Sequence, residues 1–214
     1  MLCCRGGVYV LNRGLPVGSG LLDGLTFKVA DVLERDRAFE LRGRVYREEL
    51  GHDGLDGFDE HAHHLIAIDR DGKLLAALRI VGPDQRPFDM ERLVTLADFL
   101  PGDRVPGELS RFCVDPAFRR VERGSFVHLG MFKLAHSFAR KHGLTDFVTL
   151  ALPHLRNGYR VGFFRSVGPD LIHPTWGPVS LMHLDLIDLK QRYGRSSRPM
   201  ARLLFEDDPP NIRI

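Results

Sequence analysis

The order of apolar and polar positions predicts a strand followed directly by a helix near the start of the chain. Residues 25–30 alternate in the manner of a half-buried strand. From Asp31 onward the pattern becomes helical, with an apolar stripe formed by Leu33, Leu41, Val45, Tyr46 and Leu50. Gly51 predicts the end of this helix, because glycine readily adopts the left-handed conformation found just after a helix.

A β-hairpin and a further strand are predicted in the middle of the chain. Two apolar runs, at 64–69 and 73–81, flank the turn Arg70-Asp71-Gly72, and an Asp-Gly pair in this setting strongly favours a hairpin. The connection that follows contains a short predicted helix at 93–99. Residues 108–115 have the pattern of the next strand.

The remaining pattern predicts two helices and three strands. Gly143 closes the longer helix, and the strand after it is almost wholly apolar, which is typical of a strand covered on both faces. These elements are a helix at 125–142, a strand at 147–152, a helix at 155–164 and strands at 170–175 and 179–186.

A single domain at 25–205 accounts for this pattern. A chain of 214 residues is long enough for one sizeable core and short for two. Residues 1–24 are rich in glycine and lack a period, which predicts a flexible N-terminal arm, and residues 206–214 predict a poorly ordered tail. The order of elements predicts the α/β (α+β) class, with a mixed central sheet and helices on both faces.

Composition narrows the partners and the compartment. Hydrophobic residues make up 43% of the chain, charged residues 27%, and the net charge is +2, so nucleic acid is not expected as a partner. No apolar run is long enough to span a bilayer, and the N-terminus lacks the pattern of a secretory signal. The three cysteines form neither a disulfide framework nor a zinc pattern, so we expect a cytoplasmic protein.

Charged residues within the apolar pattern indicate a buried site. Asp56 and Asp59 lie in the loop after the first helix, and a loop can turn both carboxylates inward to hold an ammonium group or an arginine. Arg79 lies in an otherwise apolar strand, and arginine is seldom buried without a carboxylate partner. Solvated aspartates and an outward Arg79 are the alternatives, but the apolar neighbours favour pairing of Arg79 with Asp56 or Asp59.

Glu108 and Arg111 lie three residues apart in a predicted strand. Such residues face opposite sides of a regular strand, so a bulge is needed to bring both to one face. A bulged strand that splays from its neighbour offers free backbone groups to a ligand, and bulges collect beside active sites. Taken alone, a surface salt bridge on an edge strand explains the pair at least as well.

The loop before the long helix is a candidate anion site. Its arginines, Arg119 and Arg120, precede Gly124 and Ser125 at the helix start, and this combination favours a phosphate such as that of phosphopantetheine or coenzyme A. No cysteine or carboxylate set completes a metal site with the neighbouring histidines at 61–64, so no metal is expected. Cys113, alone in an apolar strand, suits packing better than nucleophilic catalysis.

Taken together in chain order, these charged residues resemble a known family. The set resembles that of the acyl-homoserine-lactone (autoinducer) synthases and their relatives, the N-acyl amino acid synthases, which have an acetyltransferase-like (GNAT) fold. The segments 45–51, 58–65 and 108–115 look most like the N-acyl amino acid synthase branch. Specific motifs extend from Arg42 to Gly143, and beyond Gly143 the resemblance rests on the order of elements. The matching residues are Arg42, Tyr46, Asp56, Asp59, Arg79, Glu108 and Arg111.

The resemblance implies an acyltransferase with no permanently bound cofactor. The donor is a fatty acyl-phosphopantetheine, on acyl carrier protein or coenzyme A, and the acceptor is an amino acid or another small amine. Glu108 is implied as the general base, with Arg111 and Arg79 as further catalytic residues. We expect substrate binding by Arg42, Tyr46, Asp56, Asp59, Phe112, Cys113 and Val114, and binding of the donor phosphate by Arg119, Arg120, Gly124 and Ser125.

The expected mechanism is aminolysis of a thioester, which needs a neutral amine, a site for the oxyanion and a route for the leaving thiol. Glu108 would take a proton from the acceptor's ammonium, directly or through a water. Backbone amides at 112–115 would hold the thioester carbonyl, and the pantetheine arm would lie between this strand and the strand at 147–152. Candidates for an acyl tunnel, each equally suited to plain core, are Phe112, Phe126, Leu129, Phe132, Phe147 and Leu150.

The sequence departs from the autoinducer synthases at one point. Those enzymes usually carry a tryptophan soon after the aromatic residue matched by Tyr46, where it lines the S-adenosylmethionine site. Here Leu50-Gly51-His52 follows instead, and the only tryptophan, Trp176, is far along the chain. The departure favours an N-acyl amino acid synthase. An autoinducer synthase proper and a non-catalytic acyl-carrier binding module are the alternatives.

Overall fold

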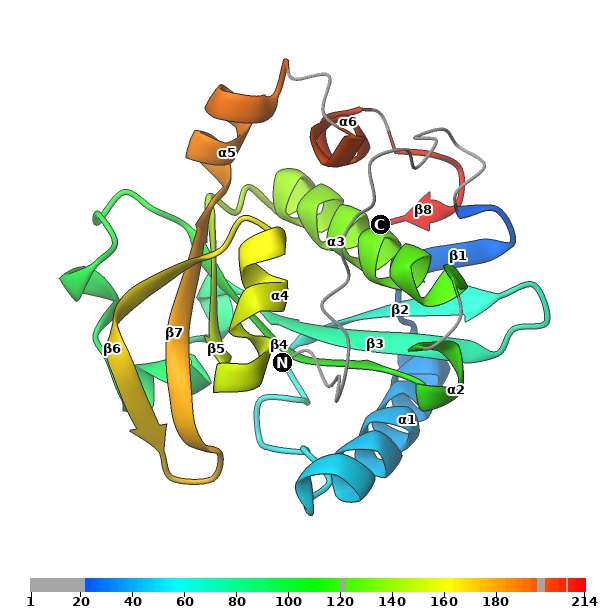
Figure 1. The fold of residues 1–214 in the computed structure, drawn as a ribbon, viewed down its shortest axis with the longest axis horizontal. Coiled ribbons are helices and arrows are strands. Elements are labelled where there is room, and N and C mark those ends of the chain that lie inside the picture. The colour runs from blue at the N-terminus through cyan, green and yellow to red at the C-terminus, as the bar shows by residue number, and fades with distance from the viewer. Residues whose placement is uncertain (1–21, 120–121, 196–198, 207) are drawn as a thin grey trace.

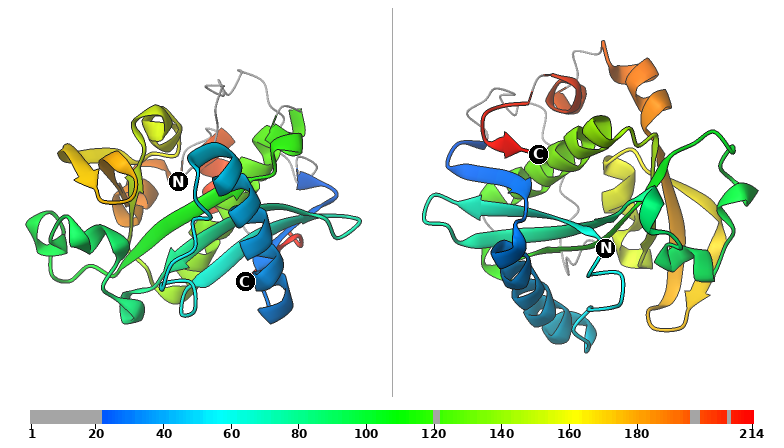
Figure 2. Two further views of the ribbon diagram at one scale, coloured as in Figure 1. Left: turned by 90° about the horizontal axis from the view of Figure 1, so that it is seen from below. Right: turned by 180° about the vertical axis from the view of Figure 1, so that it is seen from behind.

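The computed structural model describes residues 22–119, 122–195, 199–206 and 208–214. Over these residues the chain forms a mixed eight-stranded sheet with the strand order β6-β7-β5-β4-β3-β2-β1-β8 (Figure 1). Helix α1 covers one face of the sheet, and α3 and α4 lie on the other (Figures 1 and 2). The predicted mixed α/β sheet with helices on both faces is therefore confirmed.

The elements of the first half follow the sequence pattern closely. They are β1 (Leu25–Val29), α1 (Val32–Leu50), β2 (His63–Asp69) and β3 (Leu74–Val81). The Asp31 carboxylate accepts a hydrogen bond from the Glu34 backbone N–H (3.0 Å), and the Glu34 carboxylate accepts one from the Asp31 N–H (3.1 Å), so a reciprocal cap begins α1. Gly51, with a φ of 80°, ends it as predicted.

The connection between β3 and β4 differs from the prediction. In place of one short helix at 93–99 it contains three 3₁₀ turns, at Pro83–Gln85, Asp89–Arg92 and Leu96–Asp98. Apolar side chains of this connection pack on β5 and β7, which explains why a segment without helical period is ordered. The resulting core cluster, separate from the main core of the sheet, consists of Val81, Phe88, Met90, Leu96, Leu100, Val148 and Leu181.

The second half contains more short elements than the pattern predicts. The predicted strand at 108–115, helix at 125–142 and strand at 147–152 correspond to β4, α3 and β5, whereas the helix expected at 155–164 is shorter. The elements not predicted are α2, α5, α6 and β8, each of eight residues or fewer. The observed elements are β4 (Pro106–Val114), α2 (Pro116–Arg119), α3 (Glu122–His142), β5 (Asp146–Ala151), α4 (Arg156–Val161), β6 (Arg165–His173), β7 (Gly177–Asp185), α5 (Leu186–Tyr193), α6 (Pro199–Phe205) and β8 (Ile212–Arg213).

The C-terminal segment is not a loose tail. Strand β8 pairs in parallel with β1, with Ile212 opposite Phe27. The Asn211 side chain donates hydrogen bonds to the carbonyl oxygens of Leu22 and Leu25, both at 3.0 Å. The expectation of a poorly ordered segment at 206–214 is therefore corrected, because its last residues complete the edge of the sheet. Most of the expected arm at 1–24 lies outside the described residues.

The sheet opens between β4 and β5. These parallel strands pair only from Pro106 to Glu108, opposite Asp146–Val148, and β5 then continues along β7. Beyond Glu108, β4 is paired on its β3 side alone among the described strands. The centre of the sheet therefore offers an unpaired backbone edge, and the site is built around it.

Candidate active site

A bulge in β4 sets the direction of the side chains at this opening. Arg79 pairs with Ser110 and Ala77 pairs with Cys113, so a single residue of β3 faces both Arg111 and Phe112. Arg111 has a φ of 55°, in the left-handed region that non-glycine residues seldom adopt. The predicted bulge is present, and it brings Arg111 to the same face as Glu108.

A polar pocket of about 310 Å³ lies on that face, beside the opening of the sheet. Two of the three residues predicted as catalytic, Glu108 and Arg111, line it, whereas Arg79 does not. Its lining residues are Asp89, Glu108, Ser110, Arg111, Leu150, Trp176 and Val179.

Arg79 connects the two loop carboxylates behind the pocket. It is fully buried, forms ion pairs with Asp56 and Asp59, and donates a hydrogen bond from Nε to Ser110 Oγ (3.0 Å). Arg42 of α1 forms a second ion pair with Asp59, at 2.6 Å. The predicted pairing of Arg79 is therefore confirmed, and both candidate partners contribute to it.

Arg111 links the same loop to the wall of the pocket. Its guanidinium forms ion pairs with Asp56 and with Asp89 (3.4 Å), and its Nε donates a hydrogen bond to the Gly54 carbonyl oxygen (3.1 Å). Its Cζ also lies 4.5 Å from the centroid of the Trp176 ring, which is cation–π geometry. Arg111 is thus held on every side, in keeping with an orienting role.

Tyr46 supports this arrangement from α1. It is fully buried, and a Cβ added to Gly54 would lie only 2.3 Å from Tyr46 Cδ1. Gly54 also has a φ of 69°, so both the close approach and the backbone conformation require glycine. Tyr46 therefore packs against the start of the loop that carries Asp56 and Asp59, where the Gly54 carbonyl oxygen accepts the hydrogen bond from Arg111 of β4.

Glu108 is the carboxylate least compensated by arginine. In the described part of the chain, Asp56, Asp59 and Asp89 each form ion pairs with arginine, whereas Glu108 forms none and accepts one hydrogen bond from the Met90 backbone N–H (3.1 Å). Burial raises the pKa of Glu108, although the charge of Arg79 opposes that effect. A buried carboxyl with a raised pKa is suited to proton transfer.

Asp56 has the opposite character. Burial alone would raise its pKa, but the hydrogen bonds and charges of Arg79 and Arg111 outweigh burial and hold the pKa at about 2. Asp56 therefore stays ionised and keeps the two arginines in place. The pKa values of the two carboxyls are thus shifted in opposite directions, and Glu108 is the one able to exchange a proton.

The residues after the bulge reach different surroundings. The Phe112 ring turns to the opposite face and meets His128 of α3 edge-on, with 5.3 Å between centroids. Cys113 is buried, and burial raises the pKa of its thiol to about 11, which suits packing better than nucleophilic attack. The Val114 carbonyl oxygen accepts a hydrogen bond from Arg119 Nε (2.8 Å), on the side away from β3.

The predicted phosphate site is described only in part. Arg119 pairs with Glu49 of α1 in addition to its bond to Val114. Gly124 and Ser125 lie in the first turn of α3, with side chains outside the described residues, and Arg120 lies outside them altogether. The structure therefore places Arg119 at the end of β4 and leaves the rest of this prediction untested.

Among the residues that line the polar pocket, Asp89 and Trp176 were not predicted as site residues, and neither was His173, which lies beside the pocket and faces Asp89. Trp176 lies in the turn between β6 and β7, and its ring centroid is 4.2 Å from that of His52 and 6.2 Å from that of Tyr46. The tryptophan that seemed absent near Tyr46 is therefore supplied by a distant segment. This corrects the premise on which S-adenosylmethionine was disfavoured.

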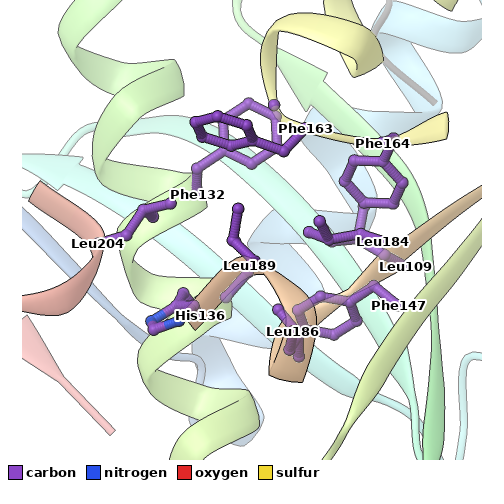
Figure 3. A pocket seen from close by; sticks show the side chains of 12 residues that line it. Leu109, Phe132, His136, Phe147, Phe163, Phe164, Leu184, Leu186, Leu189 and Leu204 are labelled. Atoms are coloured by element: carbon purple, nitrogen blue, oxygen red, sulfur yellow. The ribbon is translucent and has the colours of Figure 1, made fainter. Parts of the chain in front are cut away.

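An apolar pocket of about 370 Å³ lies on the opposite face of the sheet. Figure 3 shows aromatic and aliphatic side chains converging on it, with His136 as the polar side chain among those labelled. Of the tunnel candidates, Phe132 and Phe147 line it. Leu150 lines the polar pocket instead, because residues three apart in a strand face opposite sides. The lining consists of Leu109, Phe132, Ala135, His136, Phe147, Gly162, Phe163, Phe164, Leu184, Leu186, Leu189 and Leu204.

Comparison with known proteins agrees with this geometry. Residues 37–127 match the family model described as an acetyltransferase (GNAT) domain. No helix among the described residues is long and apolar enough to cross a membrane. The family match and the mixed eight-stranded sheet together identify the fold as that of the GNAT proteins, as the sequence resemblance implied.

Solved structures of two enzyme classes are similar to this chain. FeeM, an N-acyl amino acid synthase from uncultured soil microbes, is 16% identical with a TM-score of 0.66, covering 77% of this chain and 91% of its own. The CoA-dependent acyl-homoserine lactone synthase BjaI, solved with SAM and isopentyl-CoA, is 21% identical with a TM-score of 0.59, covering 84% and 99%. The AHL synthase LasI is 16% identical with a TM-score of 0.58, covering 76% and 90%. No curated protein matches the chain in sequence.

Proposed function

We propose that this protein is an N-acyltransferase that moves a fatty acyl chain from an acyl carrier protein or acyl-CoA thioester to the amine of an amino acid. One observation carries the proposal. Strand β4 separates a polar pocket that contains Glu108 from an apolar pocket lined by Leu109, at the point where β4 and β5 part. An acyl chain in the apolar pocket and an amine in the polar pocket would meet at this opening.

The reaction follows from this placement. Glu108 takes a proton from the acceptor's ammonium, and the free amine attacks the thioester carbonyl carbon. The C–N bond forms, the C–S bond breaks, and the thiolate leaves with the proton that Glu108 releases. The second proton of the amine nitrogen then passes to the regenerated Glu108 carboxylate and from there to solvent, which leaves a neutral amide. Arg111 orients the acceptor side of the pocket, and Arg79 supports Asp56 and Asp59 without touching substrate.

The free edge of β4 is our proposed site for the thioester carbonyl. The Asp115 N–H donates to the Leu75 carbonyl oxygen (2.8 Å) and is not available. Alternation along an antiparallel pair then turns the Val114 N–H toward the open side. Arg119 of α2 follows this edge directly. Together with Arg120, and with Gly124 and Ser125 of the first turn of α3, it remains the proposed site for the donor phosphate. Residues 25–205, with strand β8 completing the edge of their sheet, would form the catalytic domain.

A second candidate function is that of an acyl-homoserine-lactone synthase that uses S-adenosylmethionine. The observation in its favour is the position of Trp176 beside Tyr46, His52 and Arg111. Incubation of the protein with an acyl donor and either free amino acids or S-adenosylmethionine separates the two, with products identified by mass spectrometry. We expect an N-acyl amino acid. A lactone formed only with S-adenosylmethionine would favour the second candidate, and tight carrier binding without thiol release would indicate a binding module.

The apolar pocket predicts opposite shifts in acyl-chain preference for two variants. Phe132→Ala enlarges the pocket and should favour donors longer by several carbons, whereas Ala135→Leu fills it and should favour donors shorter by about two to three carbons. Competition among acyl-CoA donors of graded length measures both. Phe99→Ala, which removes a half-buried phenylalanine outside this pocket, is the control and should not change the preference. Shifts in the same direction for both pocket variants would contradict the assignment.

A further inference from the structure

The turn between β6 and β7 is tied to the polar pocket through His173. His173 is the last residue of β6 and is 2% exposed, and Gly177, with a φ of 68°, begins β7 opposite it. Between them lie three residues that end in Trp176. Short loops of this kind hold their shape only when their backbone groups find partners.

The two ring nitrogens of His173 have separate roles. Its Nδ1 accepts hydrogen bonds from the backbone N–H groups of Thr175 (3.1 Å) and Trp176 (3.3 Å). Because Nδ1 is an acceptor, a neutral ring carries its proton on Nε2. Nε2 faces the carboxylate of Asp89 at 3.5 Å. Burial lowers the pKa of His173, although the nearby Asp89 opposes this effect. Because the pKa is lowered, the ring is neutral at neutral pH.

Both ends of His173 therefore lead to the wall of the polar pocket. One end fixes the backbone of Trp176, whose ring lies over the Arg111 guanidinium, and the other faces Asp89, which is ion-paired with the same arginine. Asp89 and Trp176 both line the pocket, whereas His173 does not. The imidazole closes a chain of contacts from the hairpin turn through Arg111 to the connection at 83–105.

We propose that His173 is a positioning residue with two effects: it holds the Trp176 ring over Arg111, and it holds the Asp89 carboxylate toward the polar pocket. The β6–β7 turn would thereby form part of the acceptor site. That the ligand of this site is the amine acceptor rests on the proposed function. The placement of Trp176 itself does not depend on any reaction.

Two substitutions separate the two ends of the imidazole. In His173→Asn the side-chain carbonyl oxygen replaces Nδ1, and asparagine readily accepts from the backbone N–H two residues on. In His173→Gln the side-chain amide replaces the Nε2 donor, and the acceptor for the turn is lost. Since Trp176 is the only tryptophan, intrinsic fluorescence reports on its position alone.

We expect the emission of His173→Asn to match that of the wild type and that of His173→Gln to shift to longer wavelength, because the ring leaves Arg111. His183→Gln, which alters a half-buried imidazole bonded to Asp146, is the control and should leave the emission unchanged. Equal shifts in the two His173 variants, or none in His173→Gln, would overturn the proposal. Circular dichroism confirms that each variant is folded.

The kinetic readout links the turn to the acceptor. With the free amino acid that gives most product in the transfer assay, His173→Gln should raise the KM for the amino acid about tenfold and leave the KM for lauroyl-CoA unchanged. An equal rise in both KM values would indicate a general structural defect and count against the proposal. If no amino acid is acylated but the fluorescence results hold, the proposed function fails while the role of His173 stands.

Discussion

Glu108→Gln should lower kcat/KM for acyl transfer by about 10²–10⁴-fold, the usual contribution of a positioned general base. Gln keeps an oxygen that can accept the hydrogen bond from the Met90 N–H, so the strand and the pocket should remain as they are. A thiol-release assay with acyl-CoA and amino acid measures the loss. The activity of Glu108→Gln should fall because the glutamine amide cannot take a proton from the acceptor's ammonium.

The pH profile gives a second test of the same residue. A general base must be ionised, so wild-type activity should fall as the pH is lowered through the pKa of Glu108. Burial raises that pKa, which places the fall above the ordinary value of 4.5 for a glutamate. In Glu108→Gln this acid limb should vanish, leaving only the titration of the acceptor's own ammonium.

The exposed Glu48 of α1 offers a matched control, since Glu48→Gln makes the same chemical change at a residue that does not line the pocket. It should leave both kcat/KM and the acid limb as in the wild type. Survival of the acid limb in Glu108→Gln, at near wild-type turnover, would show that another group takes the proton.

The site was partly predictable because buried charge is conspicuous against an apolar pattern. Arg79 lies among Leu78, Ile80 and Val81, and arginine in such a run must find carboxylates, which the preceding loop supplies. The bulge at Arg111 could also be anticipated, since Glu108 and Arg111 could share a face only if the strand gained a residue. These inferences depend on local pattern and on simple pairing rules.

Other parts of the site were beyond such rules because they depend on contacts between distant segments. Trp176 reaches Tyr46 only because β6 and β7 lie at one edge of the opened sheet, and nothing in the neighbourhood of either residue indicates it. Asp89 lies in a connection without period, ordered by its apolar contacts with β5 and β7. Strand β8 is two residues long, too short for alternation to be recognised.

Leu150 shows a different kind of error. It was placed with Phe147 in one tunnel because both are apolar residues of the same strand, although their spacing puts them on opposite faces. The strand is covered on both faces, so hydrophobicity alone could not separate them. Strict use of the strand period puts Phe147 and Leu150 on opposite faces, and in the structure Phe147 lines the apolar pocket and Leu150 the polar one.

Arg79→Met should destabilise the protein by about 3–5 kcal/mol, the usual cost of removing one partner from a buried ion pair. Methionine approximates the volume of the alkyl chain but leaves Asp56 and Asp59 with one arginine partner each and Ser110 Oγ without its donor. The stability of Arg79→Lys should lie between those of the wild type and Arg79→Met, because an ammonium group keeps the charge but lacks the planar fork that reaches both carboxylates and the hydroxyl. Urea unfolding measures the free energy of each variant.

The acid dependence of this loss follows from Asp56. Its pKa is about 2 in the folded protein against 3.8 for the free group, so it stabilises the fold above about pH 4 and loses that effect as the pH falls through 2. Without Arg79 the folded pKa should return toward 3.8, and the difference in stability between wild type and variant should narrow from pH 4 to pH 2. Arg86→Met breaks the exposed pair with Glu91 and should cost about 1 kcal/mol or less at any pH. A similarly small cost for Arg79→Met would mean that Arg42 and Arg111 alone hold the acidic loop in place.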